Sequence, residues 1–485
     1  MEIIFGSSDS KVSQSIGRAL RSGALRKIKG KIYTDNMIDP LAKVVGRNIY
    51  IILGKSFPEA VISHRSALEG GAPTADGYLV LTYKYTKTFT LPGYVIKLIA
   101  GDGQQVGDTP FIGGLYLASR ARTLLDNLQT SRTINGFNKN SPQIEVENYL
   151  DKICSIHGSE ELNKIRDQAK QLSIKLKYNK EYKKLDSLIG TLLGTNSNVK
   201  LHSKTAIARA KGNPFDNYRS ELFAKLTSEL QKKILPNIDD PIVSPDSLQT
   251  LAFFESYFSN YIEGTKFAVN EAEDIVFQHK ISSRPEDAHD VLGTFQIVSN
   301  SNTMRQTPNS AKELVDILKE RHTILLKMRR DKNPGKFKEA LNQAGNTLFV
   351  APELVVGTLT QGFTYYQTLT NGLARAIFMM FLISEVHPFV DGNGRIARIM
   401  MNAELVHAGL CRIIIPTVFR EDYMLSLKRL SKTLDPDAYI MMLVKAQKFT
   451  ASIDYSNYDQ ALEMLKKSNA FKEPYEGKLL FNFFS

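Results

Sequence analysis

Residues 387–398 read HPFVDGNGRIAR, and the rest of the chain is interpreted outward from this stretch. The preceding run from Leu373 to Val386 is mainly apolar and has the length of a buried helix. Pro388 ends that helix because a proline cannot continue it, which places His387 at its C-terminal end. A second helix is expected to begin after the glycines. The sequence therefore predicts two helices joined by a short polar loop.

This loop has the composition of an anion site. Gly392, Asn393 and Gly394 permit backbone conformations in which successive N–H groups turn toward one anion at the start of a helix. Arg395 and Arg398 are three residues apart and so share one face of the second helix. The pattern favours a polyphosphate, which has room for both guanidinium groups. The alternative is a tight turn between two helices with exposed arginines and no ligand.

Every specified position of the stretch matches the signature His-Pro-Phe-x-Asp/Glu-Gly-Asn-Gly-Arg-x-x-Arg, so the chain resembles the Fic family (filamentation induced by cyclic AMP). The resemblance implies a protein adenylyltransferase, which moves AMP from ATP to a Ser, Thr or Tyr hydroxyl of a target protein or of itself. It also implies these roles: His387 as the base, Asp391 as the Mg²⁺ ligand, Gly392, Asn393, Gly394 and Arg395 as phosphate ligands, and Arg398 as the residue that orients the γ-phosphate.

A second motif lies upstream. Ser244-Pro245-Asp246 predicts a helix start, with Ser as the cap and Pro in the first turn, and Gly264 ends the same helix. Its last turn, Ser259 to Gly264, is similar to the inhibitory motif Ser/Thr-x-x-x-Glu-Gly/Asn of Fic proteins. This similarity implies that Ser259, Glu263 and Gly264 are inhibitory and that Glu263 pairs with Arg398. The alternative is an ordinary solvated helix end.

Between the two motifs, the resemblance implies a β-hairpin flap that binds the target segment by strand addition. Arg329–Lys338 and Gly345–Pro352 occupy the corresponding place, although the limits of the flap stay open. Phe389 is expected to pack beneath the motif loop. After the second motif helix, the chain predicts further helices and a Phe-rich tail that is packed or bound to a partner, namely Phe481, Phe483 and Phe484.

The N-terminal region has the pattern of a small basic module. Val12 to Leu25 shows helical spacing at Ile16 and Leu20 and then a Gly stop, and Arg26 to Tyr33 alternates around a Gly turn as a hairpin does. A helix followed by a hairpin is how a winged helix ends. Residues 1–47 carry nine Lys and Arg against four Asp and Glu. DNA contacts are therefore predicted for Arg18, Arg21, Arg26, Lys27, Lys29 and Lys31. The alternative is a small helical domain with a solvated basic face.

The middle region is similar, in pattern only, to abortive-infection type IV antitoxins (AbiEi-like), which are winged-helix regulators. The likeness rests on residues 60–69, 78–83 and 114–126. His64 and Arg65 suggest a site, but His64 is interpreted as structural, because a His at a helix position without a metal or acid partner is more often structural. From Glu147 to Gly194 the period is helical, with an apolar stripe formed by Leu162, Ile165, Ala169, Leu172 and Leu176.

The whole chain of 485 residues has room for two or three domains. We predict a mostly α protein: an α/β N-terminal region with a winged-helix-like module at 1–81, an AbiEi-like domain and linker at 82–212, and an all-helical Fic domain with a small flap at 213–485. Within that domain the inhibitory helix covers about 245–264 and the core motif 387–398. No stretch predicts a secretion signal or membrane span, so we expect a cytoplasmic protein.

Composition adds little about function. Cys154 and Cys411 are far apart and lack metal-ligand spacing, so buried thiols are expected and not a disulfide or a zinc site. The net charge of +12 favours anionic partners without naming one.

Three functional alternatives remain open. The chain could be chiefly a DNA-binding antitoxin-like regulator with a Fic effector domain. It could be a Fic enzyme that removes AMP or transfers another phosphate-containing group. It could also be a toxin and its antitoxin fused in one chain, which overlaps the main interpretation. The target protein, the DNA site and homo-oligomer formation are not decided by the sequence.

Overall fold

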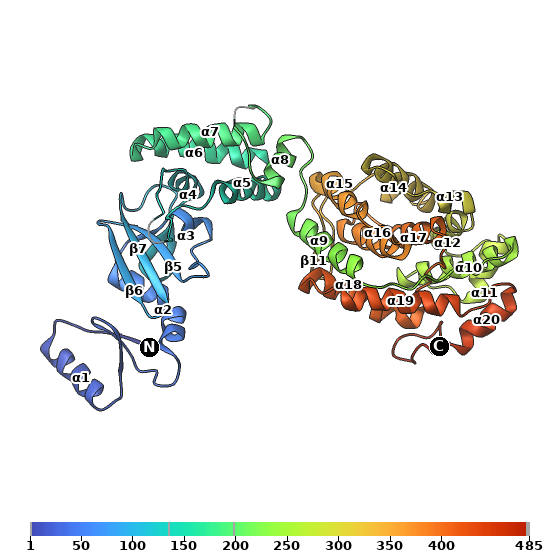
Figure 1. Ribbon diagram of the computed structural model, residues 1–485, viewed down its shortest axis with the longest axis horizontal. Coiled ribbons are helices and arrows are strands. Elements are labelled where there is room, and N and C mark those ends of the chain that lie inside the picture. The colour runs from blue at the N-terminus through green and yellow to red at the C-terminus, as the bar shows by residue number, and fades with distance from the viewer. Residues whose placement is uncertain (1, 134–135, 197–198, 482–485) are drawn as a thin grey trace. The chain divides into compact units, whose positions relative to one another are not determined.

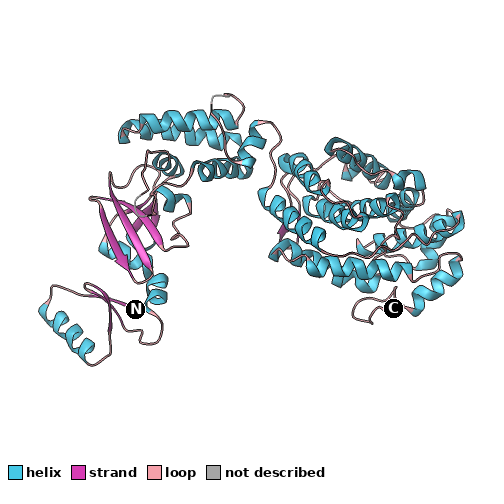
Figure 2. Cartoon of the chain, viewed as in Figure 1, coloured by secondary structure: helices cyan, strands magenta, loops and turns pink. Residues whose placement is uncertain are grey.

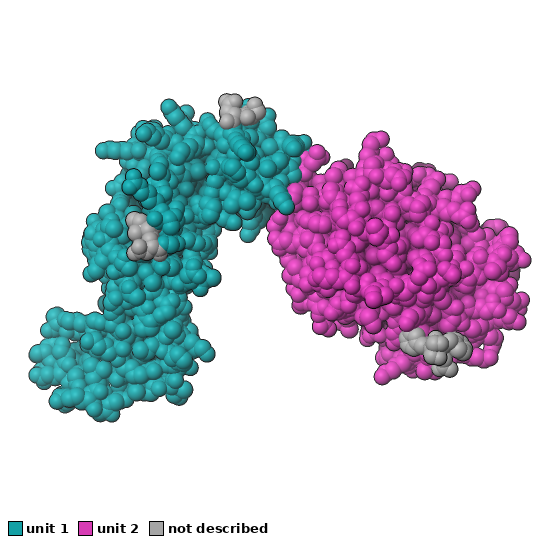
Figure 3. Space-filling model, viewed as in Figure 1, with its two compact units in different colours: residues 1–212 teal, residues 213–485 magenta. Residues whose placement is uncertain are grey.

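The computed structural model describes residues 2–133, 136–196 and 199–481. The chain divides into two compact units, residues 1–212 and 213–485 (Figure 3). The division between Gly212 and Asn213 is the position at which the last domain was expected to begin.

The first unit begins with helix α1 and a three-stranded antiparallel sheet in the order β1-β3-β2. The bounds are β1 Ile3–Phe5, α1 Ser10–Arg21, β2 Arg26–Lys29 and β3 Ile32–Thr34. The predicted hairpin is confirmed, and β1 is an additional strand that the sequence pattern did not indicate. The helix ends at Arg21, just before Gly23, which adopts a left-handed conformation with φ +74°, so the expected glycine stop is present. The winged-helix interpretation stays a prediction.

A six-stranded mixed sheet follows in the order β6-β7-β5-β4-β9-β8. Its strands are β4 Val61–Ile62, β5 Tyr78–Tyr83, β6 Lys87–Leu91, β7 Tyr94–Ala100, β8 Thr109–Phe111 and β9 Leu115–Leu117. Helix α2 (Leu41–Ser56) packs on this sheet through Val45, Ile49 and Leu53. The expected boundary at residue 81 is wrong, because it falls inside β5, which pairs with strands on both sides.

Helices complete the first unit, as Figure 1 shows. They are α3 His64–Leu68, the short 3-10 turn η1 Ile112–Gly114, α4 Arg120–Asn127, α5 Gln143–His157, α6 Ser159–Leu176, α7 Asn179–Leu192 and α8 Lys204–Ala210. The predicted stripe of α6 is buried and forms a core with α5 and α7. His64 is also buried, with Nδ1 2.9 Å from the Ser63 hydroxyl, and burial lowers its pKa to about 3. Its environment fits the structural interpretation.

The second unit is almost entirely helical in its described part, as the cyan ribbons of Figure 2 show. Its helices are α9 Asn217–Lys232, α10 Pro245–Ile262, α11 Val269–Phe277, α12 Pro285–Val298, α13 Ser301–Arg305, α14 Ala311–Leu325, α15 Val355–Tyr366, α16 Gly372–Val386, α17 Asn393–His407, α18 Arg420–Thr433, α19 Asp437–Ala451 and α20 Tyr458–Lys467. Short 3-10 turns are η2 Arg330–Lys332, η3 Pro352–Leu354 and η4 Thr417–Phe419, and a hairpin pairs β10 Gln343–Ala344 with β11 Thr347–Leu348.

Helix α16 is the centre of this unit. From Ile377 to Ile383 every side chain is apolar and buried, so this part of the helix is apolar on all sides, and α16 packs against α9, α15 and α17. Helix α10 starts as predicted, with Ser244 as its cap and Pro245 in the first turn. Its Glu255 forms a buried ion pair with Arg412 at 2.9 Å and accepts a hydrogen bond from Asn402 at 2.9 Å. These contacts fix α10 to the helical core.

Other expectations are settled in the same unit and in the chain as a whole. Phe481 packs on Phe449 with ring centroids 5.4 Å apart, whereas Phe483 and Phe484 lie outside the described residues. Cys154 and Cys411 are buried, and they form no disulfide. In the described part of the chain, no helix has the length and apolar character needed to cross a membrane.

Candidate active site

The motif loop joins α16 to α17 through two left-handed residues. His387 ends α16 with φ +52°, and Gly392 precedes α17 with φ +74°. The Asn393 side chain closes the loop between them, since its Oδ1 accepts from the Phe389 N–H at 2.8 Å and its Nδ2 donates to the Phe389 carbonyl at 2.9 Å. Phe389 is fully buried, which confirms that it packs beneath the loop. The first turn of α17 therefore presents its N–H groups at a fixed place.

The imidazole of His387 lies between the loop and the flap. Its Nδ1 is 3.4 Å from the carbonyl oxygen of Ser384, and its ring stacks on Phe349 at 3.7 Å with an interplanar angle of 7°. Burial lowers the pKa of His387 to about 4, and the nearby Lys338 charge acts in the same direction. The ring is therefore neutral at pH 7, which is the form that a general base requires.

Asp391 is the single acid of the motif, and it is accessible. Its side chain is 43% exposed, and its Oδ1 accepts the Gly392 N–H at 2.6 Å. No cluster of three or more His, Cys, Asp or Glu side chains suited to a metal occurs among the described residues. One accessible carboxylate nevertheless fits Mg²⁺, which commonly takes one or two carboxylates and completes its shell with water and substrate phosphates.

Arg395 is held inside the protein. Its Nη1 lies 2.8 Å from Asp290 of α12 and 3.4 Å from the Asn260 side-chain oxygen of α10, and its side chain is almost completely buried. Asp290 also pairs with Arg329 at 2.9 Å. In this structure Arg395 ties α17 to α10 and α12, which the sequence pattern did not indicate.

Arg398 meets the end of α10. Its Nη2 donates to Glu263 Oε1 at 2.7 Å and to the Ser259 carbonyl at 2.8 Å, and its Nε donates to the Ser259 hydroxyl at 3.0 Å. The expected ion pair is therefore present. Gly264, with φ +98°, follows Glu263 and turns the chain away from the helix.

The Glu263 carboxylate also lies against the first turn of α17. A Cβ placed on Gly394 would come within 2.2 Å of Glu263 Oε1, so only glycine leaves room for this approach. A negatively charged oxygen thus occupies the start of α17, where the positive end of the helix dipole favours an anion. Of the residues predicted to bind phosphate, Gly394 and Arg398 lie at this position.

His322 of α14 is a component that the sequence did not reveal. Its ring stacks on Phe389 at 3.7 Å, its Nδ1 accepts the Gly335 N–H at 2.9 Å, and its Nε2 lies 3.1 Å from the Asp391 carbonyl oxygen. The two contacts fix the tautomer, because Nδ1 accepts and Nε2 must therefore donate. Burial lowers the pKa of His322 to about 4. A single histidine in an amphipathic helix carries no local signal of such a role.

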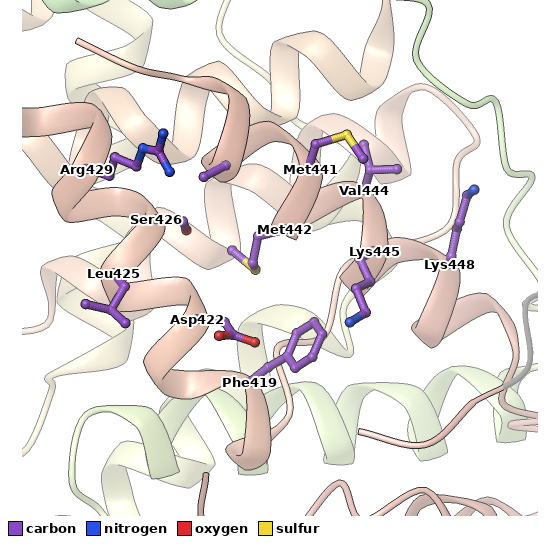
Figure 4. Close-up of a pocket in the computed structure, with 11 residues that line it drawn as sticks. Phe419, Asp422, Leu425, Ser426, Arg429, Met441, Met442, Val444, Lys445 and Lys448 are labelled. Carbon is purple, nitrogen blue, oxygen red and sulfur yellow. The ribbon is translucent and has the colours of Figure 1, made fainter. Parts of the chain in front are cut away.

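A groove elsewhere in the same unit has a different character. It measures about 470 Å³ between α18 and α19 and is lined mainly by apolar side chains, including Phe419, Met441 and Met442, with Lys445 beside them (Figure 4). None of its lining residues belongs to the 387–398 motif. The groove is therefore separate from the candidate active site.

In the first unit, the residues predicted to contact DNA fall into two groups. Arg18, Arg21, Lys27 and Lys31 are exposed. Arg26 donates to the carbonyls of Asn36 and Asp39, the latter at 2.6 Å, and Lys29 donates to the Thr90 carbonyl at 2.5 Å. Arg26 and Lys29 are thus used to hold the unit together.

Comparison with known proteins identifies the second unit's family. A model of the Fic/DOC family matches residues 313–405, which contain the whole motif. A Fido domain-containing protein of Dictyostelium discoideum is 31% identical over 99 residues, or 19% of this chain and 69% of that protein. Protein adenylyltransferase fic-1 of Caenorhabditis briggsae is 22% identical over 232 residues, which cover 47% of this chain and 46% of fic-1. The chain thus spans less than half the length of that relative.

Among solved structures, a fragment of Fic-1 from C. elegans aligns at 17% identity with a TM-score of 0.36, covering 68% of this chain and 90% of the fragment. The family itself rests on sequence. With 31% identity across 69% of the Dictyostelium protein and a family match that includes the intact motif, the chain belongs to the Fic/DOC family.

Proposed function

We propose that this chain is a protein adenylyltransferase that moves AMP from ATP to a Ser, Thr or Tyr hydroxyl. The observation that carries the proposal is the anion position at the start of α17, which is bounded by Gly394 and Arg398 and already holds the Glu263 carboxylate. A site that binds one carboxylate in this way has the charge and the backbone donors for a phosphate. The similarity to fic-1 of Caenorhabditis briggsae, which is named a protein adenylyltransferase, supports the same activity.

In the proposed reaction, His387 Nε2 accepts the proton of the target hydroxyl while the hydroxyl oxygen bonds to the α-phosphorus. The bond from that phosphorus to the bridging oxygen breaks, and pyrophosphate leaves. The N–H groups of the 392–394 loop stabilise the charge on the phosphates, and Arg398 orients the γ-phosphate. Arg395 assists only if it can leave Asp290, and otherwise it supports the loop from behind.

Asp391 is the residue that would hold Mg²⁺, which neutralises charge on the phosphates when bound. Its exposed carboxylate suits that role better than the buried acids nearby, such as Asp290, which is paired with two arginines.

We further propose that Glu263 inhibits the enzyme. While Glu263 holds Arg398, ATP meets a carboxylate where its γ-phosphate must lie, so it binds in an unproductive position or not at all. Because the pair lies at the exposed end of α10 and Glu255 anchors the middle of the helix, release needs only a local movement of Glu263.

The experiment that tests the activity uses the full chain with α-labelled ATP, Mg²⁺ and a cell extract. Transfer of label to protein bands is expected from the parent and from Glu263→Gly, and none above background from His387→Ala. Retained ATP binding by His387→Ala is the control for folding. Equal labelling by His387→Ala would remove His387 from the role of base.

A second candidate function concerns the first unit. We propose that its exposed basic residues Arg18, Arg21, Lys27 and Lys31 bind DNA phosphates. A groove of about 490 Å³ beside the hairpin supports this, because Lys31, Lys55 and Lys87 are among the residues that line it. Specific binding of a promoter by the full chain would favour the interpretation as a DNA-binding regulator. No DNA binding at low salt would exclude that interpretation and also the proposed phosphate contacts.

A further inference from the structure

The flap is fixed to the motif loop immediately beyond His387. The Lys338 N–H donates to the Pro388 carbonyl at 2.9 Å, and Asn342 Nδ2 donates to the Phe389 carbonyl at 2.9 Å. Lys338 is buried, and its ammonium group donates to Asn342 Oδ1 at 2.6 Å. The first flap segment therefore follows the loop through three linked hydrogen bonds.

The returning flap segment is held from the other side. Arg219 of α9 donates to the Leu348 carbonyl at 2.7 Å and pairs with Glu385, which lies two residues before His387, at 3.4 Å. The Phe349 N–H donates to the Asn342 carbonyl at 3.2 Å. The flap segment that carries Phe349 and the helix end that carries His387 are thus connected to each other, while β10 and the hairpin tip remain exposed.

These contacts place two rings face to face. The Phe349 and His387 centroids are 3.7 Å apart and their planes differ by 7°, so one face of the imidazole is completely covered. Its Nδ1–H donates a hydrogen bond to the Ser384 carbonyl, so the proton stays on Nδ1 and the Nε2 lone pair is left for a reacting hydroxyl. When both the ring plane and the tautomer are fixed, the imidazole can accept a proton only at Nε2 and only along the direction of its lone pair.

We propose that Phe349 is a positioning residue for His387, whose stacked ring holds the imidazole in the plane that presents Nε2 to the target hydroxyl. The inference deepens the proposed function, because it assumes that His387 is the base. Phe349 touches no reacting atom. Its contribution comes from the orientation of the base and from keeping water off one face of the ring.

Charged groups from three elements face the imidazole: Lys338 of the flap, Glu263 at the end of α10 and Asp391 of the motif loop. Removing the Phe349 ring alters none of these charges and admits water. We therefore expect the His387 signals to titrate at a higher pH in a variant that lacks the ring, since burial is the main cause of the lowered pKa.

The test compares full-length variants in the Glu263→Gly background, in which transfer is not inhibited. Phe349→Leu removes the ring, Phe349→Tyr keeps it, and Val356→Ala is the matched control because it truncates an exposed apolar side chain of α15, outside the flap. We expect Phe349→Leu to lower kcat at least about tenfold with KM for ATP changed less than about twofold. Phe349→Tyr and Val356→Ala should keep most of the parent kcat.

A second readout does not depend on transfer. Nitrogen-15 spectra of histidine-labelled protein, with His387 assigned through His387→Ala, report its tautomer and its titration. The parent should show a neutral ring protonated at Nδ1, and Phe349→Leu should show a mixture of tautomers and a raised midpoint. Unchanged spectra with unchanged kcat, or a higher kcat in Phe349→Leu, would overturn the proposal. If no variant transfers AMP, the proposed function fails, and the spectra still decide whether Phe349 positions the ring.

Discussion

The Glu263–Arg398 pair makes a quantitative prediction about inhibition. Replacing Glu263 by Gly removes the carboxylate that lies 2.7 Å from Arg398 and frees the start of α17 for a phosphate. Hydrogen bonds between charged groups contribute about 1.5–3 kcal/mol, which corresponds to about 10- to 150-fold in rate. The Glu263 side chain is 32% exposed, so solvent screening favours the lower part of this range.

The assay measures AMP transfer from α-labelled ATP to targets and to the protein itself, with ATP affinity determined separately by calorimetry. Glu263→Gly should transfer at least about tenfold faster than the parent. Glu271→Gly is the matched control, since Glu271 is a partly exposed acid of helix α11 that forms an ion pair with Arg284 at 3.9 Å. Activation should come with a lower Tm, because Arg398 is buried and loses its charged partner.

Two results would contradict inhibition by Glu263. If Glu263→Gly labels no better than the parent while both bind ATP equally, then Ser259 to Gly264 is a helix end without a regulatory role. Equal activation by Glu271→Gly would instead indicate a general effect of removing negative charge.

Three further outcomes are expected. Gly394→Ala should weaken ATP binding, measured by calorimetry, and also displace Glu263, since the new Cβ would lie 2.2 Å from Glu263 Oε1. An unchanged affinity for ATP would mean that the phosphates bind elsewhere. Burial lowers the pKa of His387 and His322 to about 4, below their usual 6.5, so on acidification the unfolded state binds protons before the folded state does. The free energy of unfolding, measured with urea, should therefore fall as the pH is lowered from about 6.5 to about 4. A free energy that stays constant over this range would contradict the buried neutral rings. The double variant Lys27→Glu, Lys31→Glu should bind DNA more weakly than the parent and with a smaller salt dependence, whereas the control variant Lys164→Glu, at an exposed position, should bind as the parent does. Equal gel shifts by the parent, the double variant and the control, or no shift by any of them at low salt, would refute the DNA proposal.

Local patterns predicted the local parts of this structure. The Ser244-Pro245 cap, the hairpin at Arg26 to Tyr33 and the two motif helices each depend on a few adjacent residues whose backbone preferences agree. The pairing of Glu263 with Arg398 was anticipated only because a family motif linked two distant segments.

Long-range contacts escaped prediction. Arg395 meets Asp290, His322 meets Phe389, and Phe349 meets His387, each across tens of residues. No period or spacing in the sequence encodes which side chains meet when helices pack. The boundary placed at residue 81 failed for the same reason, because β5 becomes central only once its partner strands join it.

The most direct test of the central claim compares α-labelled with γ-labelled ATP, using full-length Glu263→Gly and the same protein carrying His387→Ala. The account predicts protein labelling from α-labelled ATP alone, release of pyrophosphate, and loss of both in the His387→Ala protein although it still binds ATP. Labelling from γ-labelled ATP, or equal labelling with and without His387, would contradict AMP transfer by this site.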